Sequence, residues 1–164
     1  MKIAILGFSG SGKSTLAKKL GQRYGVPVLH FDSVQFLPGW QERPLEEKLK
    51  ITEEFLNTND QWVIDGNYTQ LFYRRRLEEA DKIIILMFNR FACLWRVIRR
   101  YFTYRHTTRP DMGEGCPEKI DREFVMWVLR DGRKKAAVAR HKDIAKRYPD
   151  KTVIIRNQRQ LNKI

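Results

Sequence analysis

The hydrophobic residues of the chain gather in five short runs, which are separated by amphipathic stretches. These runs lie at residues 2–6, 27–32, 62–65, 82–88 and 152–156. They are largely continuous apolar runs rather than alternating apolar and polar positions, which is typical of parallel strands buried on both faces. We therefore predict five strands, the second ending at Asp32 and the third at Asp65.

Helical periodicity fills the intervals between these runs. It predicts helices over about 13–24, 45–57, 70–79, 91–104 and 121–149, the last with a break at Gly132. Strands that alternate with helices predict an α/β fold, with a five-stranded parallel sheet and helices on both faces.

Two segments have no place in the core of the predicted sheet. Residues 33–60 and 103–118 are expected to form a substrate-binding insert and a short lid within one domain that spans 1–164. The stretch "QFLPGWQERP" in the insert is expected to be irregular, because Pro38, Gly39 and Pro44 interrupt it.

Composition narrows the class of protein. The chain has 164 residues, of which 42% are hydrophobic, enough for a folded core. Its cysteines, Cys93 and Cys116, form no CxxC pair, so neither a thiolate zinc site nor a disulfide framework is indicated. The longest apolar run, Ile83–Phe88, is too short to cross a bilayer, so we expect a cytoplasmic protein with no membrane partner.

Charge is distributed unevenly along the chain. Residues 1–88 hold 12 basic and 11 acidic residues, whereas residues 89–164 hold 20 basic and 8 acidic ones. A phosphate-bearing or polyanionic partner should therefore face the second half, although a solvated basic surface would give the same count.

The stretch "GFSGSGKST" carries the strongest chemical signal. Gly7, Gly12, Lys13 and Ser14 satisfy the Walker A pattern G-x-x-x-x-G-K-[ST], between a predicted strand and a predicted helix. Glycines let backbone N–H groups converge on phosphate oxygens, and the helix N-terminus adds partial positive charge. The pattern predicts a P-loop NTPase fold that binds ATP and Mg²⁺, with phosphates held by Gly7, Ser9, Gly10, Ser11, Gly12, Lys13, Ser14 and Thr15.

Two acids fall at predicted strand ends, where parallel sheets deliver functional groups. We expect Asp65 to join Ser14 in holding Mg²⁺, and Asp32 to act in catalysis. Asp32 would orient the acceptor, or take its proton if that acceptor is a hydroxyl compound.

Runs beyond the phosphate loop resemble a known family. "HFDSVQFLPGWQ" (His30 to Gln41), "WVIDGNY" (Trp62 to Tyr68) and "TTRPDMGEGCPEKID" (Thr107 to Asp121) are similar to the proteins labelled DNA topology modulation protein, which resemble adenylate kinase as small P-loop kinases. The resemblance implies a five-stranded parallel sheet, nucleotide binding and a role for Asp65 near Mg²⁺. Asn67 and Tyr68 stand where adenylate kinases carry Phe-Pro, a departure from that pattern.

Arginines are expected to complete the site, because phosphoryl transfer needs positive charge on the transferring group. Arg96, Arg99 and Arg100 share one helix face, and Arg105 and Arg109 are predicted as catalytic residues of the lid. A basic helix face that serves solubility is the alternative. Of the three consecutive arginines at 74–76, one is expected to face phosphate.

The sequence thus favours an ATP-dependent kinase of a small acceptor, either a nucleotide or another small metabolite. Phe31, Phe36 and Trp40 are expected either to form the acceptor pocket or to be core of a small subdomain. The alternative function is a nucleic-acid-binding P-loop NTPase that influences DNA topology, whose DNA binding would be non-specific.

Overall fold

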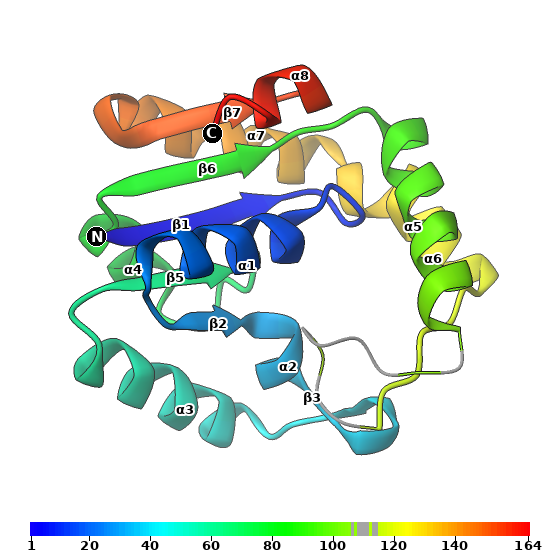
Figure 1. Cartoon of the computed structure of the whole chain (residues 1–164), viewed down its shortest axis with the longest axis horizontal. Coiled ribbons are helices and arrows are strands. Elements are labelled where there is room, and N and C mark those ends of the chain that lie inside the picture. The colour runs from blue at the N-terminus through cyan, green and yellow to red at the C-terminus, as the bar shows by residue number, and fades with distance from the viewer. Residues whose placement is uncertain (106, 108–111, 113–114) are drawn as a thin grey trace.

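The computed structural model describes residues 1–105, 107, 112 and 115–164. Among these, five strands form one parallel sheet (Figure 1), in the spatial order β2-β5-β1-β6-β7. The strands are β1 (Lys2–Gly7), β2 (Val28–His30), β5 (Trp62–Asp65), β6 (Lys82–Leu86) and β7 (Thr152–Ile155). The predicted five-stranded parallel sheet is therefore confirmed.

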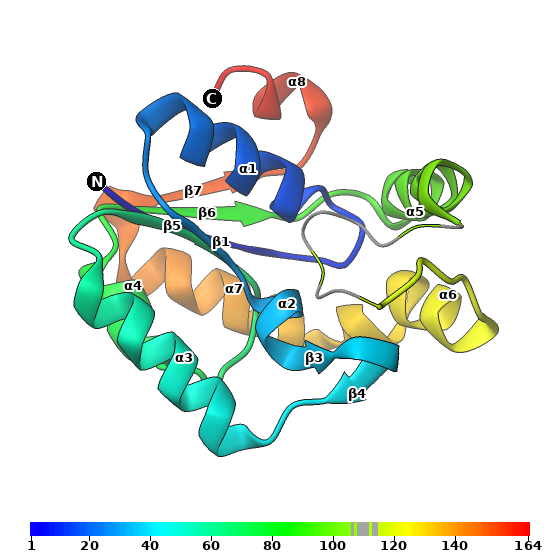
Figure 2. The same cartoon turned by 60° about the horizontal axis from the view of Figure 1, so that its bottom comes forward.

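Helices cover both faces of the sheet and make three layers (Figure 2). One face carries α1 (Lys13–Tyr24) and α8 (Gln158–Leu161), and the other carries α3 (Leu45–Thr58), α4 (Tyr73–Glu79) and α7 (Lys135–Arg147). Two further helices, α5 (Arg90–Tyr104) and α6 (Arg122–Leu129), lie beyond the carboxyl ends of the strands.

The core has two halves because side chains of a strand alternate between the sheet faces. Ile3 and Ile5 of β1 pack toward Leu16 and Leu20 of α1. Ala4 and Leu6 pack into the opposite half, whose helix residues include Leu56, Leu77 and Ile144. Both halves are buried, which explains why the strands read as continuous apolar runs.

The strand order determines at which end of which strand a ligand site is expected. From β1 the chain moves outward to β2, returns to β5 and then crosses to β6 on the other side of β1. The loops that follow β1 and β6 therefore diverge, and they leave a crevice at the carboxyl end of β1. Open parallel sheets bind ligands at such a switch point.

Two local predictions were wrong. The second strand ends at His30 rather than Asp32, because the chain turns into a short helix, α2 (Phe31–Gln35), that buries Phe31 and Val34. The stretch around "PGW" is regular rather than irregular: β3 (Phe36–Leu37) and β4 (Gln41–Glu42) pair antiparallel around a 3₁₀ turn (Pro38–Trp40). Gly39 has φ +75° there, so glycine makes this tight turn possible.

The break predicted at Gly132 is present. Helix α6 ends at Leu129, a 3₁₀ turn covers Asp131–Arg133, and α7 begins at Lys135. This break turns the chain from the open end of the sheet back along its face.

Arg76 is a buried guanidinium that ties down the loop after β5. Its side chain is 1% exposed and donates to the carbonyl oxygens of Leu71 (2.8 Å), Tyr68 (2.7 Å) and Gly66 (3.4 Å). It also lies 4.3 Å from the centre of the Phe31 ring. Burial lowers the pKa of Arg76 to about 9. The expectation that one arginine at 74–76 faces phosphate is wrong: Arg74 and Arg75 pair with Glu78 and Glu79, and Arg76 points into the core.

Replacing Arg76 with Met should destabilise the protein by roughly 2–4 kcal/mol, because buried carbonyl oxygens lose their donors. Arg74→Met is the matched control, since the Arg74 side chain is 85% exposed, and it should change stability by less than about 0.5 kcal/mol. Urea denaturation measures both. Equal stability of the two variants would contradict the structural role of Arg76.

Candidate active site

The phosphate loop connects β1 to α1 at the crevice, and its glycines are required by close contacts. Gly7, Gly10 and Gly12 have φ values of +136°, +74° and +94°. A Cβ atom on Gly7 would lie 2.3 Å from the carbonyl oxygen of Leu86, and one on Gly10 would lie 2.7 Å from that of Cys93. The loop is therefore packed directly against β6 and α5, and larger residues would displace it.

The start of α1 is open to an anion. Gly12 is the N-cap and has no side chain to satisfy the first-turn N–H groups. Lys13 follows, and its ammonium donates to the carbonyl oxygen of Phe8 at 3.1 Å, which folds the side chain over the loop. Burial lowers the pKa of Lys13, and the nearby carboxylates of Asp32 and Asp65 oppose that shift. A lysine held in this way is positioned to meet a phosphate at the loop.

Ser14 and Asp65, which the sequence predicts to hold Mg²⁺ together, are in hydrogen-bond contact. The Ser14 hydroxyl donates to Asp65 Oδ2 at 2.9 Å, and His30 Nδ1 lies 2.5 Å from the other oxygen, Oδ1. Asp65 is 4% exposed at the end of β5, between β1 and β2. A hydroxyl and a carboxylate are oxygen ligands of the kind Mg²⁺ prefers, and Mg²⁺ commonly takes one or two carboxylates together with substrate phosphates. The two residues therefore fit a Mg²⁺ ion shared with a bound nucleotide.

The sequence after Asp65 joins the phosphate loop to the rest of the site. Asn67 makes two hydrogen bonds to the backbone of Gly7: its Oδ1 accepts from the Gly7 N–H (3.0 Å) and its Nδ2 donates to the Gly7 carbonyl (2.7 Å). Gly66 between them has φ +138°, and a Cβ atom there would lie 2.7 Å from Phe31 Cβ. Asn67 thus fixes the first glycine of the loop, a role that the motif alone did not reveal.

Tyr68 fixes the second predicted acid. Its hydroxyl donates to Asp32 Oδ1 at 2.8 Å. Burial, together with the Asp32 carboxylate, raises the pKa of Tyr68 far above its usual value, so the phenol stays protonated and remains a donor. Although Asp32 stands in the first turn of α2 rather than at a strand end, it lines the same cleft as the phosphate loop.

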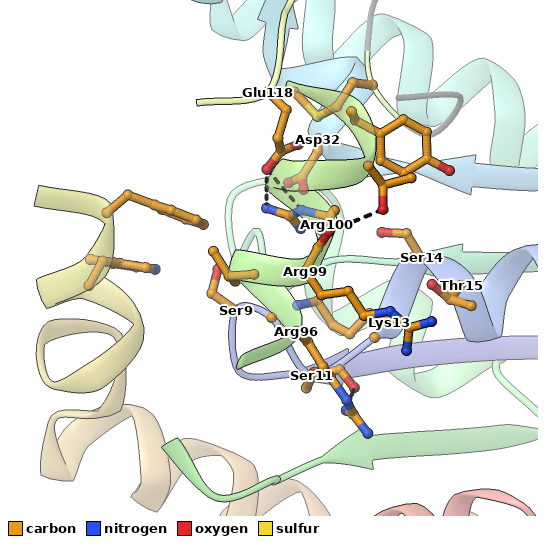
Figure 3. A pocket seen from close by; sticks show the side chains of 18 of the residues that line it. Ser9, Ser11, Lys13, Ser14, Thr15, Asp32, Arg96, Arg99, Arg100 and Glu118 are labelled. Carbon is orange, nitrogen blue, oxygen red and sulfur yellow. Dashed lines mark hydrogen bonds and ion pairs between the residues drawn. The ribbon is translucent and has the colours of Figure 1, made fainter. Parts of the chain in front are cut away.

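The arginines predicted on one helix face all line this cleft (Figure 3). Arg96 donates to the Ser11 carbonyl (2.7 Å) and to Gln158 Oε1 (2.6 Å), and burial lowers its pKa. Arg100 pairs with Glu118 at 2.6 Å. Together with Arg99, these side chains stand on α5 opposite Lys13 and Ser14 of the loop.

The cleft measures about 1210 Å³. Seven of the predicted phosphate-loop residues line it, namely Ser9, Gly10, Ser11, Gly12, Lys13, Ser14 and Thr15. Gly7 lies behind the loop, where it contacts Leu86 and Asn67.

Of the two arginines predicted as catalytic in the lid, the structure describes only Arg105. Arg105 is exposed just after α5 and is not among the lining residues, and Arg109 lies outside the described residues. Their catalytic role stays a prediction.

The hairpin of the insert contacts the segment around Cys116. The Gly39 N–H donates to the Gly115 carbonyl (2.8 Å), Trp40 Nε1 to the Pro117 carbonyl (3.1 Å), and the Cys116 thiol to the Leu37 carbonyl (3.3 Å). Phe36 and Trp40, on this hairpin, line the cleft. The hairpin that lines the cleft is thus hydrogen-bonded to a segment distant from it in the sequence.

Two residues that contact the phosphate loop at Phe8 were not predicted from the sequence to be functional. Arg133 lies 4.1 Å above the Phe8 ring and donates to the Phe88 carbonyl at 2.8 Å. His141 of α7 meets Phe8 edge-to-face, with ring centres 5.5 Å apart, and is 5% exposed. Burial, with smaller effects from the charges of Lys13 and Arg140, lowers the pKa of His141 to about 4. No sequence spacing distinguishes these residues from other cations of the basic half.

The five-stranded parallel sheet with helices on both faces gives the chain the α/β fold of small P-loop kinases. A gluconokinase from Sinorhizobium meliloti 1021 is similar in structure, with a TM-score of 0.53 and 18% sequence identity over 99% of this chain and 86% of that one. An uncharacterized protein from Eubacterium ventriosum ATCC 27560 is also similar, with a TM-score of 0.50 and 15% identity over 94% of this chain and 88% of that one.

No protein-family model matches the sequence, and no curated protein matches it at a significant level. The comparisons therefore establish the P-loop kinase fold, whereas the resemblance to DNA topology modulation proteins stays a prediction. No helix in the described part of the chain is long and apolar enough to cross a membrane.

We expect the Asn67→Ala variant to loosen the phosphate loop, because the Gly7 backbone loses both hydrogen bonds that the Asn67 side chain makes to it. Hydrogen–deuterium exchange at residues 7–12 should accelerate roughly fivefold or more, the effect of losing about 1 kcal/mol of hydrogen bonding. Asn59→Ala is the control, since Asn59 donates to the Phe55 carbonyl at the end of α3, away from the loop. Unchanged exchange at residues 7–12 in the Asn67 variant would show that Asn67 does not fix the loop.

His141 should make stability depend on pH. The pKa of His141 is about 4 in the folded protein, against an ordinary value of 6.5. Between these pH values the unfolded chain therefore binds a proton that the folded chain does not bind. Stability should therefore fall as pH drops from 6.5 toward 4, by at most about 3 kcal/mol. In the His141→Phe variant this slope should flatten, whatever the effect of the substitution at neutral pH. Urea unfolding at several pH values tests it, and identical slopes would show that His141 does not contribute.

Proposed function

We propose that the protein is an ATP- and Mg²⁺-dependent kinase that transfers the γ-phosphoryl group of ATP to a small acceptor. The observation that carries this proposal is the meeting of Ser14 and Asp65, 2.9 Å apart, beside the open N-terminus of α1. A phosphate loop without a metal ligand would bind a phosphate. A loop with the Ser14–Asp65 pair can also hold the Mg²⁺ ion that phosphoryl transfer requires. The fold-level likeness to a gluconokinase supports a small-molecule acceptor.

The loop would hold the nucleotide. Backbone N–H groups from Gly10 to Ser14 would surround the β-phosphate, and Lys13 would leave the Phe8 carbonyl to bind the β- and γ-phosphates. Ser14 and Asp65 would hold Mg²⁺, which when bound neutralises charge on the phosphates.

The wall formed by α5 would stabilise the transferring group. Arg96, Arg99 and Arg100 face the loop across the cleft, where negative charge on the equatorial oxygens needs compensation. We include Arg105 and Arg109 in the proposal as lid residues that reach the phosphates when the site closes.

The alternative function, a nucleic-acid-binding NTPase, has weaker support. Several cations of the basic second half have partners within the protein: Arg96, Arg100, Arg133 and Lys151. Cations that have partners inside the fold or around the cleft are explained by those partners and do not indicate a polyanionic ligand. DNA binding, if present, is expected to be non-specific and steeply dependent on salt.

Lys13→Met should weaken binding of Mg²⁺·ATP by tenfold or more, which corresponds to about 1.4 kcal/mol, while the protein stays folded. Methionine keeps the apolar stem of the side chain and removes its charge. Lys18→Met, on the exposed face of α1, is the matched control and should bind ATP as the wild type does. Isothermal titration calorimetry measures both. Wild-type affinity in the Lys13 variant would contradict the assignment of this loop as the ATP-binding site.

A further inference from the structure

The two walls of the cleft differ in charge. Among the described residues 25–88, those that line it are Asp32, Phe36, Trp40 and Tyr68, which are one acid and three aromatic residues. Lysine and arginine are absent from this set. The lining cations come from other parts of the chain: Arg96, Arg99 and Arg100 on α5 and Lys13 in the loop (Figure 3), Lys19 on α1, and Lys119. Since ATP phosphates belong at the loop, the wall on the β2 side is left for the acceptor.

The nearest cations of the insert are engaged elsewhere. Lys48 is 4% exposed, and its ammonium donates to Gln35 Oε1 (3.0 Å) and Glu42 Oε1 (2.9 Å). Arg43 donates through Nε to the Val34 carbonyl at 2.9 Å. Neither residue lines the cleft. One cation from another part of the chain does approach this wall: the Lys119 ammonium lies 5.8 Å from the centre of the Trp40 ring, and it pairs with Asp121 at 3.5 Å.

The Asp32 carboxylate disfavours a nucleoside monophosphate as acceptor. The phosphate of such an acceptor carries up to two negative charges, and it would have to approach the γ-phosphate beside the Asp32 carboxylate. Like charges repel more strongly in a partly buried cleft than in water. An uncharged hydroxyl meets no such penalty, and it can donate a hydrogen bond to the same carboxylate.

Asp32 is oriented for that role. Tyr68 donates to Oδ1 at 2.8 Å and fixes the plane of the carboxylate. The other oxygen, Oδ2, accepts no hydrogen bond from the described residues. A carboxylate with one oxygen fixed and the other open toward a cleft suits a group that orients a hydroxyl and accepts its proton.

The aromatic residues of this wall form a platform. The Phe36 and Trp40 rings meet edge-to-face with centres 5.3 Å apart, and the hydrogen bond from Trp40 Nε1 to the Pro117 carbonyl fixes the indole. Such rings pack well against the flat apolar face of a ring-shaped ligand.

From this wall we infer that the acceptor is an alcohol: a ring-bearing hydroxyl compound, uncharged at its reacting end, rather than a phosphate monoester. The inference rests on the kinase function proposed above. In the reaction, the O–H bond of the acceptor breaks and its oxygen bonds to the γ-phosphorus, while the bond from that phosphorus to the β–γ bridging oxygen breaks. Asp32 takes the proton and releases it to solvent. The products are a phosphate monoester and ADP.

Matched pairs of acceptors test the inference. Nucleosides and their own 5′-monophosphates differ by the phosphate alone, and cyclic polyols extend the hydroxyl set. With Mg²⁺·ATP, ³¹P NMR should show a monoester product from a hydroxyl compound and no nucleoside diphosphate from a monophosphate. A monophosphate that is converted to its diphosphate faster than its nucleoside is phosphorylated would overturn the inference while leaving the kinase function intact.

A binding measurement decides the matter even if the panel lacks a reactive alcohol. The protein is first saturated with Mg²⁺ and a non-hydrolysable ATP analogue, and each nucleoside monophosphate is then titrated by calorimetry. Asp32→Asn should bind monophosphates about tenfold more tightly than the wild type, because the substitution removes a repelling charge. Asp131→Asn, in the 3₁₀ turn before α7 and also lining the cleft, is the control and should not.

Equal or weaker monophosphate binding in Asp32→Asn would overturn the inference, since the carboxylate would then not exclude anions. Failure of the ATP analogue itself to bind would instead reject the proposed function. The two failures are therefore distinguishable in one experiment.

Discussion

The close approach of Gly7 to β6 is the constraint on which the site depends. The Gly7 backbone lies so near the Leu86 carbonyl that a Cβ atom would come within 2.3 Å of it, and Asn67 holds the same residue from the β5 side. The phosphate loop therefore starts from a point fixed on both sides. Everything that would touch a phosphate follows from this point: the turn at Gly10 against α5, the open first turn of α1, and Ser14 opposite Asp65.

The segment that follows β5 connects the phosphate loop to the part of the cleft proposed to bind the acceptor. The segment from Asp65 to Tyr68 contacts Ser14, Gly7 and Asp32 in turn, and Arg76 fixes its backbone from the core. Four consecutive residues thus link the proposed metal ligands, the proposed nucleotide loop and the proposed acceptor acid. A shift of this segment would disturb all three together, so we regard it as the organising element of the cleft.

The fold and the position of the glycine loop between β1 and α1 could be predicted from the sequence because their signals are local. Apolar runs gave the strands, and the glycine pattern with its flanking strand and helix gave the loop. Asp65 followed because carboxyl ends of parallel strands meet at one edge. The turn into α2 could not be predicted, since it depends on burial of Phe31 and Val34 by distant residues. Arg76 could not be separated from Arg74 and Arg75 by sequence, because burial is what distinguishes them. Asn67 and Tyr68 were visible as a departure from the adenylate kinase pattern, but their partners, Gly7 and Asp32, are distant in sequence.

The most direct test of the account is a crystal structure of the protein with Mg²⁺ and a non-hydrolysable ATP analogue. We expect the β- and γ-phosphates at the N-terminus of α1, Lys13 turned from the Phe8 carbonyl onto the phosphates, and Mg²⁺ bound by Ser14 with Asp65 beside it. A nucleotide bound elsewhere, or bound here with the Lys13–Phe8 contact intact and Mg²⁺ away from Ser14 and Asp65, would contradict it.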